Sequence, residues 1–429
     1  SHLPCVEDRR KNILIGVLLM RRKELWRKAE ETAQEKGVKQ YKYLYRRMLD
    51  ENIIRKAYKK LRKGKTKRKE IQQIDADLDN EVAAMRRMIE NTKPPDVPVE
   101  HPELAYRPKR RTPKLIKEKG KLRKIFMPKI HEQWLHHIIV LILEPIITAT
   151  AYPYSCGSFP KRGAHYGKKR LLKIIRGGKN IRNFAKIDIR HFYDSIRLDI
   201  LMRELRIRIK DELFLYIVEL CLQGFKKGIP LGFYISQWLA NYLLEPLDRF
   251  ITDKLGIKNL VRYMDDIVMG DDNKKKLHGA IIEIKKFIGR RFRLKLKKNY
   301  QVFKFNFQKK NGKVIGRVID FMGFLFFRNR TTMRKAIMLS ATRLAKKLAR
   351  AKEAGRGYFK KHLEAMLSYI GWFSCTDTYD AYQDYIKPFV KVRQLKQIIS
   401  KLTRRANKNE AVDKGAKRQQ TGRFAACGA

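Results

Sequence analysis

The stretch RYMDDIVMG (residues 262–270) carries two adjacent acids, Asp265 and Asp266, inside an apolar segment typical of a β-strand. Burying two charges in such a segment is costly unless cations compensate them. Neighbouring residues of a regular strand face opposite sides, so presenting both acids on one side requires a tight turn. The sequence therefore predicts a β-hairpin here. Residues 270–272 belong either to its descending strand or to the loop that follows.

A third acid, Asp188, lies at the end of another predicted strand, FAKIDI (184–189). If the two strands are neighbours, Asp188 and Asp265 can hold a pair of Mg²⁺ ions about 3.5–4 Å apart. Such a pair can activate a primer 3′-hydroxyl and stabilise the leaving pyrophosphate. Oxygen ligands without His or Cys favour Mg²⁺ over Zn²⁺. The alternative is that these acids are turn residues or ion-pair partners of the many lysines.

The charge balance predicts a polyanionic partner. The 429 residues include 99 Lys or Arg and 43 Asp or Glu, a net charge of +56 that is spread along the whole chain. A protein this basic repels itself unless a polyanion neutralises it. Nucleic acid is the expected partner, with binding that weakens steeply as salt rises. A ribosomal or histone-like packaging protein is the alternative, but 44% apolar and 10% aromatic residues argue against a simple coat for RNA.

The pattern of residues changes along the chain. Residues 1–105 are basic and compatible with helices, and KPPDVP (93–98) marks the boundary that follows them. Strand-like runs then alternate with helical ones to about residue 330, and helical periodicity returns over 332–400. Five cysteines without a CxxC pair argue against a zinc module or a disulfide framework and favour a reducing compartment.

The longest apolar run, residues 138–147, is interrupted by Glu144 and Pro145. It is too short to span a bilayer, so a buried helix is expected. No signal-peptide pattern is expected at the N-terminus. Together these features predict a cytoplasmic protein with no membrane partner.

Six blocks in one order over residues 106–400 resemble the reverse transcriptases of bacterial retroelements. YMDD (263–266) is similar to the family's YxDD box, and KIDIRHFYDSI (186–196) to its first palm motif. The resemblance implies RNA-directed DNA polymerase activity, with dNTP substrates and two Mg²⁺ ions. It also implies an α+β right-hand polymerase fold with fingers, a palm with an antiparallel sheet, and a helical thumb.

The implied domains are a basic helical N-terminal extension that binds RNA, the fingers, the palm with inserted finger helices, the thumb, and a basic flexible tail. Their expected bounds are 1–105, 106–183, 184–330, 331–401 and 402–429.

The resemblance assigns roles to the acids and to one aromatic residue. Asp188, Asp265 and Asp266 would be the catalytic metal ligands, helped by the backbone carbonyl of Ile189. Tyr193 would be a steric gate that crowds a 2′-hydroxyl and so selects deoxynucleotides. The alternative for Tyr193 is a core aromatic.

GIPLGFYISQWLAN (228–241) resembles the motif that supports the incoming nucleotide and the template base, with Leu231, Gly232 and Gln237 as candidate contacts. Its glycines would let the backbone approach the base pair closely. Many relatives carry Gln where Leu231 stands. An apolar residue there is similar to the error-prone enzymes of diversity-generating retroelements and implies relaxed fidelity.

Further blocks supply candidate contacts to phosphates. KLRKIFMP (121–128) and CGSFPKRGAHYGKK (156–169) resemble finger blocks, although Phe159 stands where relatives carry Arg. The expected triphosphate contacts are Arg123 and Arg162. The expected RNA contacts are Lys65, Lys67, Arg68, Lys69, Lys168 and Lys169. The expected primer grip is FMGF, Phe321, Met322, Gly323 and Phe324, and Lys297 and Lys298 are candidates for assisting the leaving pyrophosphate.

The resemblance favours a diversity-generating retroelement, in which a bacterial or phage-encoded enzyme copies a structured template RNA into an RNA/cDNA duplex. Relatives there work with a small helical-bundle accessory protein. The alternative is a defence-associated reverse transcriptase that makes cDNA from a non-coding RNA. A non-catalytic RNA-binding protein is a further alternative, and a primer-independent RNA polymerase is disfavoured by Tyr193.

Overall fold

The computed structural model describes residues 38–109, 112–118, 121–177, 181–225, 227–308 and 311–405. The chain forms two compact units, residues 1–174 with 183–302, and residues 175–182 with 303–429. The tail predicted at 402–429 and the first third of the predicted N-terminal extension lie mostly outside the described residues.

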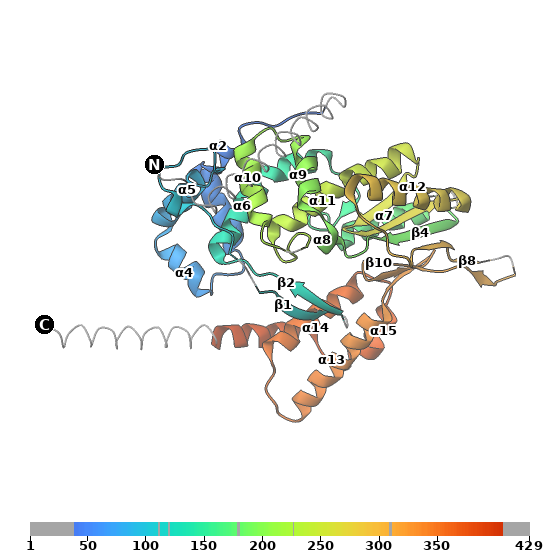
Figure 1. Ribbon diagram of the computed structural model, residues 1–429. Helices are drawn as coiled ribbons and strands as arrows, with labels where there is room; N and C mark the ends of the chain where they lie inside the picture. Colours follow the sequence, from blue (N-terminus) through green and yellow to red (C-terminus); the bar gives the residue numbers. More distant parts are fainter. Residues whose placement is uncertain are drawn as a thin grey trace, which may run out of the picture. The chain divides into compact units, whose positions relative to one another are not determined.

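Short helices form the described part of the N-terminal extension (Figure 1): α2 (Leu44–Met48), α3 (Glu51–Arg62), α4 (Lys69–Ala76) and α5 (Leu78–Glu90), followed by the 3₁₀ helix η1 (Pro102–Leu104). The side chain of Asp50 caps α3 by accepting from the backbone N–H of Asn52. Ile54, Tyr58 and Leu61 of α3 are buried at helical spacing, which turns one apolar face inward.

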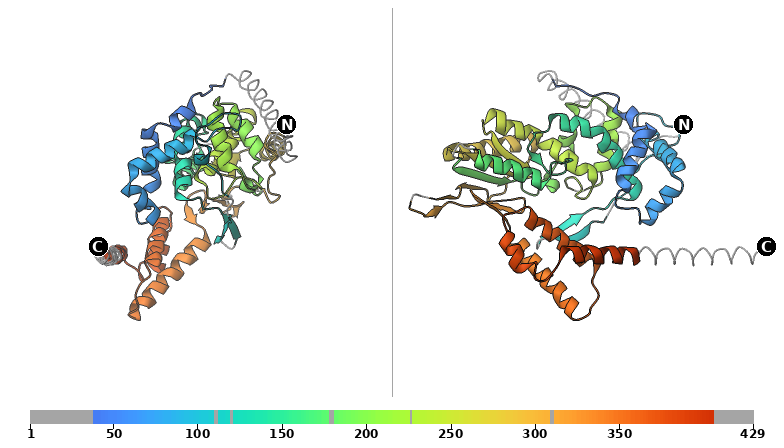
Figure 2. Two further views of the ribbon diagram at one scale, coloured as in Figure 1. Left: turned by 60° about the vertical axis from the view of Figure 1, so that its left-hand side comes forward. Right: turned by 180° about the vertical axis from the view of Figure 1, so that it is seen from behind.

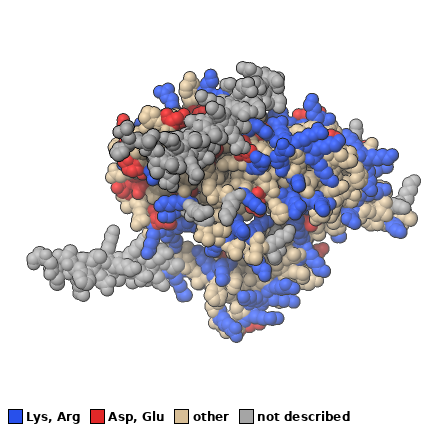
Figure 3. All heavy atoms as spheres, viewed as in Figure 1, with Lys and Arg blue, Asp and Glu red and all other residues tan. Residues whose placement is uncertain are grey.

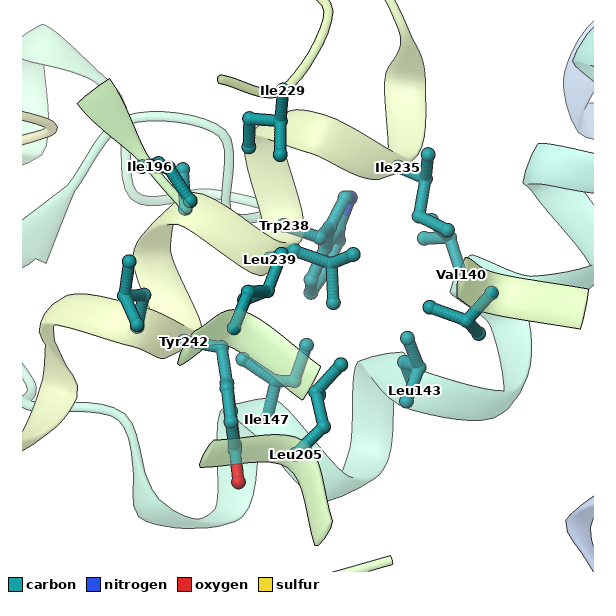
Figure 4. Close-up of a cluster of buried hydrophobic side chains, with 14 of the residues drawn as sticks. Val140, Leu143, Ile147, Ile196, Leu205, Ile229, Ile235, Trp238, Leu239 and Tyr242 are labelled. Atoms are coloured by element: carbon teal, nitrogen blue, oxygen red, sulfur yellow. The ribbon is translucent and has the colours of Figure 1, made fainter. Parts of the chain in front are cut away.

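The core of the first unit is built around α6 (Ile130–Thr150) and α11 (Tyr234–Arg249), which pack against each other. Trp134, Leu135, Ile138 and Ile142 of α6 are fully buried. Figure 4 shows Val140, Leu143 and Ile147 of α6 facing the same cluster as Trp238, Leu239 and Tyr242 of α11. α9 (Leu198–Arg206) and α10 (Glu212–Leu222) pack nearby, and α11 runs into the π-helical turn η2 (Phe250–Lys254).

The buried helix expected at the apolar run 138–147 is confirmed as α6, which continues through Pro145. The helix has 21 residues and is long and apolar enough, by length and composition, to cross a membrane. Of its most apolar window, 56% is buried within the structure. α6 packs against α3 as well as α11, and the indole N–H of Trp134 donates to the carbonyl of Ile54 at 2.8 Å. It is therefore a core helix of this unit.

A mixed sheet carries the acids. Its strand order is β3-β5-β6-β4-β7, where β3 is Ser155–Cys156, β4 Asn183–Asp188, β5 Asn259–Tyr263, β6 Asp266–Asp271 and β7 Gln301–Lys304. β4, β5 and β6 pair antiparallel, and β3 pairs parallel with β5. α12 (Lys274–Phe292) packs against β4 and β6. The unit also contains a separate hairpin, formed by β1 (Lys114–Glu118) and β2 (Lys121–Ile125). Two further helices are α7 (Ala164–Arg176) and α8 (Phe192–Ser195).

The second unit combines small antiparallel sheets with helices (Figure 2). β8 (Phe307–Gln308) pairs with β9 (Val314–Ile315), and β10 (Ile319–Phe321), β11 (Phe324–Phe326) and β12 (Thr331–Met333) form a three-stranded sheet. α13 (Lys335–Glu353), α14 (Lys360–Ser374) and α15 (Tyr379–Tyr385) follow, with their own apolar core. The two units divide the predicted palm at residue 303, and the five-part domain division stays a prediction.

Candidate active site

The predicted hairpin is present, and its turn is Met264–Asp265. Tyr263 at the end of β5 faces Asp266 at the start of β6, and the descending strand continues to Asp271. Met264 has φ 56, in the left-handed region. This conformation costs a non-glycine residue about 1–2 kcal/mol, so the surroundings must hold it.

The three acids converge at this turn, because β4 lies beside β6. Asp188 is the direct register partner of Asp266. The backbone N–H of Ile189 donates to the carbonyl of Asp265 at 3.3 Å, which ties the end of β4 to the turn itself. The expectation that the two acid-bearing strands are neighbours is confirmed.

Burial, and then the neighbouring acids, raise the pKa of Asp265 and of Asp266. Burial, and then the neighbouring charge of Asp188, raise the pKa of Asp265, while Lys297 and Arg123 act in the opposite direction. Burial raises the pKa of Asp266 to about 6, although Lys186 opposes the shift. Three carboxylates held this close together favour a cation between them.

Two lysines contact the acids. Lys297 Nζ lies 2.6 Å from Asp188 Oδ2, and Lys186 Nζ lies 3.6 Å from Asp266 Oδ2. Among the residues that the structure describes, no three Asp, Glu, His or Cys side chains form a ready-made ligand group. One carboxylate oxygen of Asp188 and one of Asp266 thus contact a lysine, as expected if these acids serve only as ion-pair partners.

The other oxygens distinguish the two interpretations. Asp188 Oδ1 and Asp266 Oδ1 are buried and have no hydrogen-bond partner among the described residues. Unpaired buried carboxylate oxygens are expensive unless a cation or donor joins them. Hard oxygen donors suit a divalent cation such as Mg²⁺. The residues present therefore fit the metal that the sequence predicts.

Tyr193 lies beside the acids. It is half-buried, and burial followed by the nearby charge of Asp265 raises the pKa of its phenol. Its neighbour Phe192 is 3% exposed. The Tyr193 ring packs edge-on against Phe192 and against the apolar core, as the core interpretation expects, and the gate role stays a prediction.

The loop at 228–233 packs on protein backbone at both of its glycines. Gly228 has φ 68, and a Cβ there would lie 2.1 Å from the carbonyl oxygen of Tyr193, which accepts from the N–H of Ile229. Gly232 has φ 106, and a Cβ there would lie 2.4 Å from the carbonyl oxygen of Phe126. These contacts account for both glycines without a nucleic acid, which the sequence interpretation had invoked.

The same loop anchors the β1–β2 hairpin. The carbonyl of Leu231 accepts from the N–H of Phe126 at 2.8 Å, and the side chain of Leu231 is half-buried. Arg123 of β2 lies near enough to Asp265 to lower its pKa. Arg123, Leu231 and Tyr193 thus border one region with the acids.

Arg162 and Gln237 make contacts within the protein. The Arg162 guanidinium reaches the carbonyl of Tyr152 at 3.5 Å and lies over the ring of Phe159. Phe159 is 6% exposed and packs edge-on against Trp238, so the Phe that replaces the family's Arg is a core residue. Gln237 Oε1 accepts from the hydroxyl of Ser158 at 3.3 Å.

The predicted RNA contacts differ in accessibility. Lys65 is half-buried and donates to Gln133 Oε1 at 2.7 Å, and burial lowers its pKa. Lys67, Arg68 and Lys69 are exposed. Lys168 and Lys169 lie on α7, half-buried and exposed respectively. Lys and Arg side chains far outnumber acidic ones on the face shown in Figure 3.

The predicted primer grip belongs to the second unit. Phe321 and Phe324 are buried, and Met322 is half-exposed with φ 53. A Cβ on Gly323 would lie 2.6 Å from the Trp372 ring. The glycine therefore lets this turn pack against α14, while the buried rings of Phe321 and Phe324 leave Met322 and the backbone as the groups nearer the surface.

Sequence reasoning missed Arg262 and Asp248, which support the acidic turn. With Asn241, which falls at a position of the 228–241 motif, they form a buried network that contacts Met264. Lys186, the counter-charge of Asp266, was also missed. An Arg inside an apolar strand and an Asp inside an apolar helix were available signals, because such residues are rarely buried unless paired.

Comparison with known proteins finds a family match for one part of the chain. A family model described as reverse transcriptase (RNA-dependent DNA polymerase) matches residues 108–319. Protein YkfC of Escherichia coli (strain K12) is 23% identical over 150 residues, which are 32% of this chain and 39% of YkfC. The matched part of the chain thus spans about two-fifths of that relative.

Solved structures of telomerase are also similar. Telomerase from Candida albicans in complex with the TWJ fragment of telomeric RNA is 12% identical with a TM-score of 0.39, covering 68% of this chain and 59% of that chain. Apo telomerase from Candida tropicalis is 12% identical with a TM-score of 0.41, covering 67% and 60%. The α+β right-hand polymerase fold expected from the sequence is confirmed by the family match, which spans the acidic turn, β4 and α11. Residues 108–319 of this chain are therefore a reverse transcriptase domain, of the RNA-dependent DNA polymerase family.

Proposed function

We propose that the whole chain acts as an RNA-directed DNA polymerase that copies a dedicated structured RNA into cDNA. The observation that carries the proposal is the convergence of Asp188, Asp265 and Asp266, with two buried carboxylate oxygens that have no partner among the described residues. A merely structural acidic cluster would be expected to satisfy these oxygens within the fold.

Each residue at the site has a part in nucleotidyl transfer. The three acids would hold two Mg²⁺ ions, which when bound activate the primer 3′-hydroxyl and stabilise the leaving pyrophosphate. Arg123, whose charge acts on Asp265, would bind the triphosphate. The Tyr193 ring would exclude a 2′-hydroxyl. Lys297, 2.6 Å from Asp188 Oδ2, would supply positive charge to the leaving pyrophosphate.

A primer-extension assay tests this function. The purified protein, with an RNA template, a DNA primer, Mg²⁺ and dNTPs, is expected to extend the primer, and EDTA should stop the reaction. Failure to extend on the RNA that co-purifies with the protein would favour a non-catalytic RNA-binding role. Equal use of rNTPs and dNTPs would favour an RNA polymerase.

The exposed cations Lys67, Arg68 and Lys69, at the start of α4, are proposed to contact the structured RNA. Neutralising Lys67, Arg68 and Lys69 together should weaken RNA binding and lower the slope of log K against log salt by about 2, since each phosphate contact contributes about 0.7–0.9. Lys65 is left intact, because it donates to Gln133 within the fold. Neutralising the exposed Lys258, Lys274 and Lys275 removes the same charge elsewhere and serves as control. Equal slopes for the two triple variants would contradict a local RNA contact.

We further propose that the enzyme is error-prone and serves a diversity-generating retroelement. Support comes from Leu231, whose half-buried apolar side chain lies in the loop that borders Tyr193 and the β1–β2 hairpin. Replacing Leu231 with Gln restores the polar group found in many relatives and should reduce misincorporation at template adenines by about 10-fold, the effect of about 1.4 kcal/mol. Leu231→Met is the apolar control and should keep the error rate.

Sequencing of the cDNA measures these errors. An unchanged adenine error rate in Leu231→Gln would contradict the role of Leu231. A dedicated non-coding RNA copied accurately, without a variable target repeat, would favour the defence-associated alternative. The small helical-bundle accessory protein and a cytoplasmic location are part of the proposal. Co-purification from the native host tests the first, and fractionation of the host cells tests the second.

A further inference from the structure

A buried ion pair lies directly beneath the acidic turn. Arg262 of β5 is 1% exposed and Asp248 of α11 is fully buried. Arg262 Nε lies 2.7 Å from Asp248 Oδ1, and Nη2 lies 2.7 Å from Oδ2. Asp248 thus takes one edge of the guanidinium in bidentate fashion and leaves Nη1 free for other acceptors.

Nη1 points at the turn. It donates to the carbonyl of Met264 at 3.0 Å and to Asn241 Oδ1 at 3.0 Å. Met264 immediately precedes Asp265 and has φ 56, a conformation that persists in an L-residue only when its surroundings hold it. The N–H of Met264 is also held, since it donates to the carbonyl of Cys156 at 3.2 Å.

Asn241 holds the same residue through its side chain. Its Nδ2 lies 3.3 Å from Met264 Sδ and 3.1 Å from the carbonyl of Gly157. The amide therefore joins Arg262, the turn and the segment at Gly157. Asn241 is 2% exposed, so these contacts are shielded from water.

One rigid element carries both supports. Asn241 and Asp248 are seven residues apart on α11, which places them on one helix face. α11 begins directly after the loop 228–233, which packs on the backbone of Tyr193 and Phe126. The helix therefore links the surroundings of Tyr193 to the turn that presents Asp265 and Asp266.

We propose that Arg262 is a positioning residue for divalent cations: by holding the Met264 carbonyl it fixes Asp265 and Asp266 against Asp188. Asp248 and Asn241 orient its guanidinium. The inference rests on the proposed function, since the acids must be metal ligands. A lysine at 262 would keep a positive charge for Asp248, but it lacks the planar fork that serves Asp248, Asn241 and Met264 together.

Arg262→Lys and Asn241→Ala test the inference, with Arg206→Lys as the matched control. Arg206 is 2% exposed and pairs with Glu212 at 3.2 Å, so the control makes the same chemical change in a buried ion pair of the same unit. The complex of each protein with primer–template and a non-hydrolysable dNTP is titrated with MnCl₂, and free Mn²⁺ is read by electron paramagnetic resonance. Melting temperature, kcat and the KM for primer–template are measured alongside.

Arg262→Lys is expected to raise the Mn²⁺ half-saturation concentration and lower kcat by about 10–100-fold, as for other residues that orient metal ligands. The KM for primer–template should not change. Asn241→Ala should shift both quantities in the same direction. Arg206→Lys should leave the Mn²⁺ titration at the wild-type value, whatever its melting temperature.

Two failures are distinguishable. If the wild-type protein neither binds Mn²⁺ at the turn nor extends primers, the proposed function fails. If the wild type does both, and Arg262→Lys keeps its Mn²⁺ titration and kcat, the positioning role is overturned. If Arg262→Lys does not fold, Asn241→Ala tests the inference instead. It removes contacts to Arg262 and Met264 without leaving a buried charge unpaired. An unchanged Mn²⁺ titration of Asn241→Ala overturns the inference.

Discussion

Replacing Asp265 and Asp266 together with alanine is expected to abolish primer extension, with a loss of at least about a thousandfold. A bound metal stabilises the transition state by several kcal/mol, and each 1.36 kcal/mol is worth about tenfold in rate. The variant should retain RNA affinity, because the change removes two negative charges from a strongly basic protein. Single-turnover extension and RNA binding at several salt concentrations measure the two effects separately.

Asp271→Ala with Asp272→Ala provides the matched control. These acids follow on the same hairpin, at the far end of β6, and Asp271 pairs with Lys276 at 2.9 Å. The control removes the same charge and should keep most of the activity. Primer extension by the Asp265→Ala, Asp266→Ala variant at a rate near the wild-type rate would end the assignment of the turn as the catalytic centre.

Replacing Tyr193 with alanine is expected to let ribonucleotides enter. The half-buried Tyr193 ring borders Asp265, so an added 2′-hydroxyl would have to displace it. Crowding of this kind costs about 1–3 kcal/mol, and its removal should lower discrimination between dNTPs and rNTPs by about 10–100-fold. Competition between dCTP and CTP in single-nucleotide incorporation gives the ratio of kcat/KM values directly.

Tyr193→Phe keeps the ring and removes only the hydroxyl. If the ring is the gate, this variant should discriminate as the wild type does. If Tyr193→Phe admits ribonucleotides as readily as Tyr193→Ala, selection depends on the phenol rather than on crowding. Wild-type discrimination in Tyr193→Ala would mean that the residue has no part in sugar selection.

The acidic centre was predictable because its signals are local. Two adjacent acids in an apolar strand require a turn, and a third acid at a strand end, Asp188, requires a neighbouring strand to bring it close. The structure has both features, with Met264–Asp265 as the turn and Asp188 opposite Asp266. The register itself was not predicted, and a slip by one residue would turn Asp188 to the other face.

The supporting contacts were not predictable in the same way, because they join segments that are far apart in the sequence. Arg262 of β5 and Asp248 of α11 meet only through the tertiary fold, in which η2 at the end of α11 packs against β5, and no local pattern gives that pairing. Gly228 and Gly232 illustrate the same limit. These glycines were expected to allow a close approach of the backbone to the base pair. The groups that lie against them are the backbone carbonyls of Tyr193 and Phe126.

Charge runs and apolar runs were also ambiguous. The basic stretch at 65–69 does not predict that Lys65 donates to Gln133, because composition does not fix where a long side chain points. The apolar run at 138–147 is shorter than α6, which begins at Ile130 among polar residues and continues through Pro145. Burial of α6 against α3 and α11 decides its length, and tertiary packing of this kind overrides local propensity.

The proposed function requires a metal pair among Asp188, Asp265 and Asp266. Crystals of the complex with primer–template, a non-hydrolysable dNTP and MnCl₂ would locate Mn²⁺ by anomalous scattering. Two peaks are expected, contacted by the carboxylates of Asp188 and Asp265, with Lys297 moved away from Asp188 Oδ2. A complex with nucleotide bound, no peak at these carboxylates and Lys297 still paired with Asp188 would contradict it.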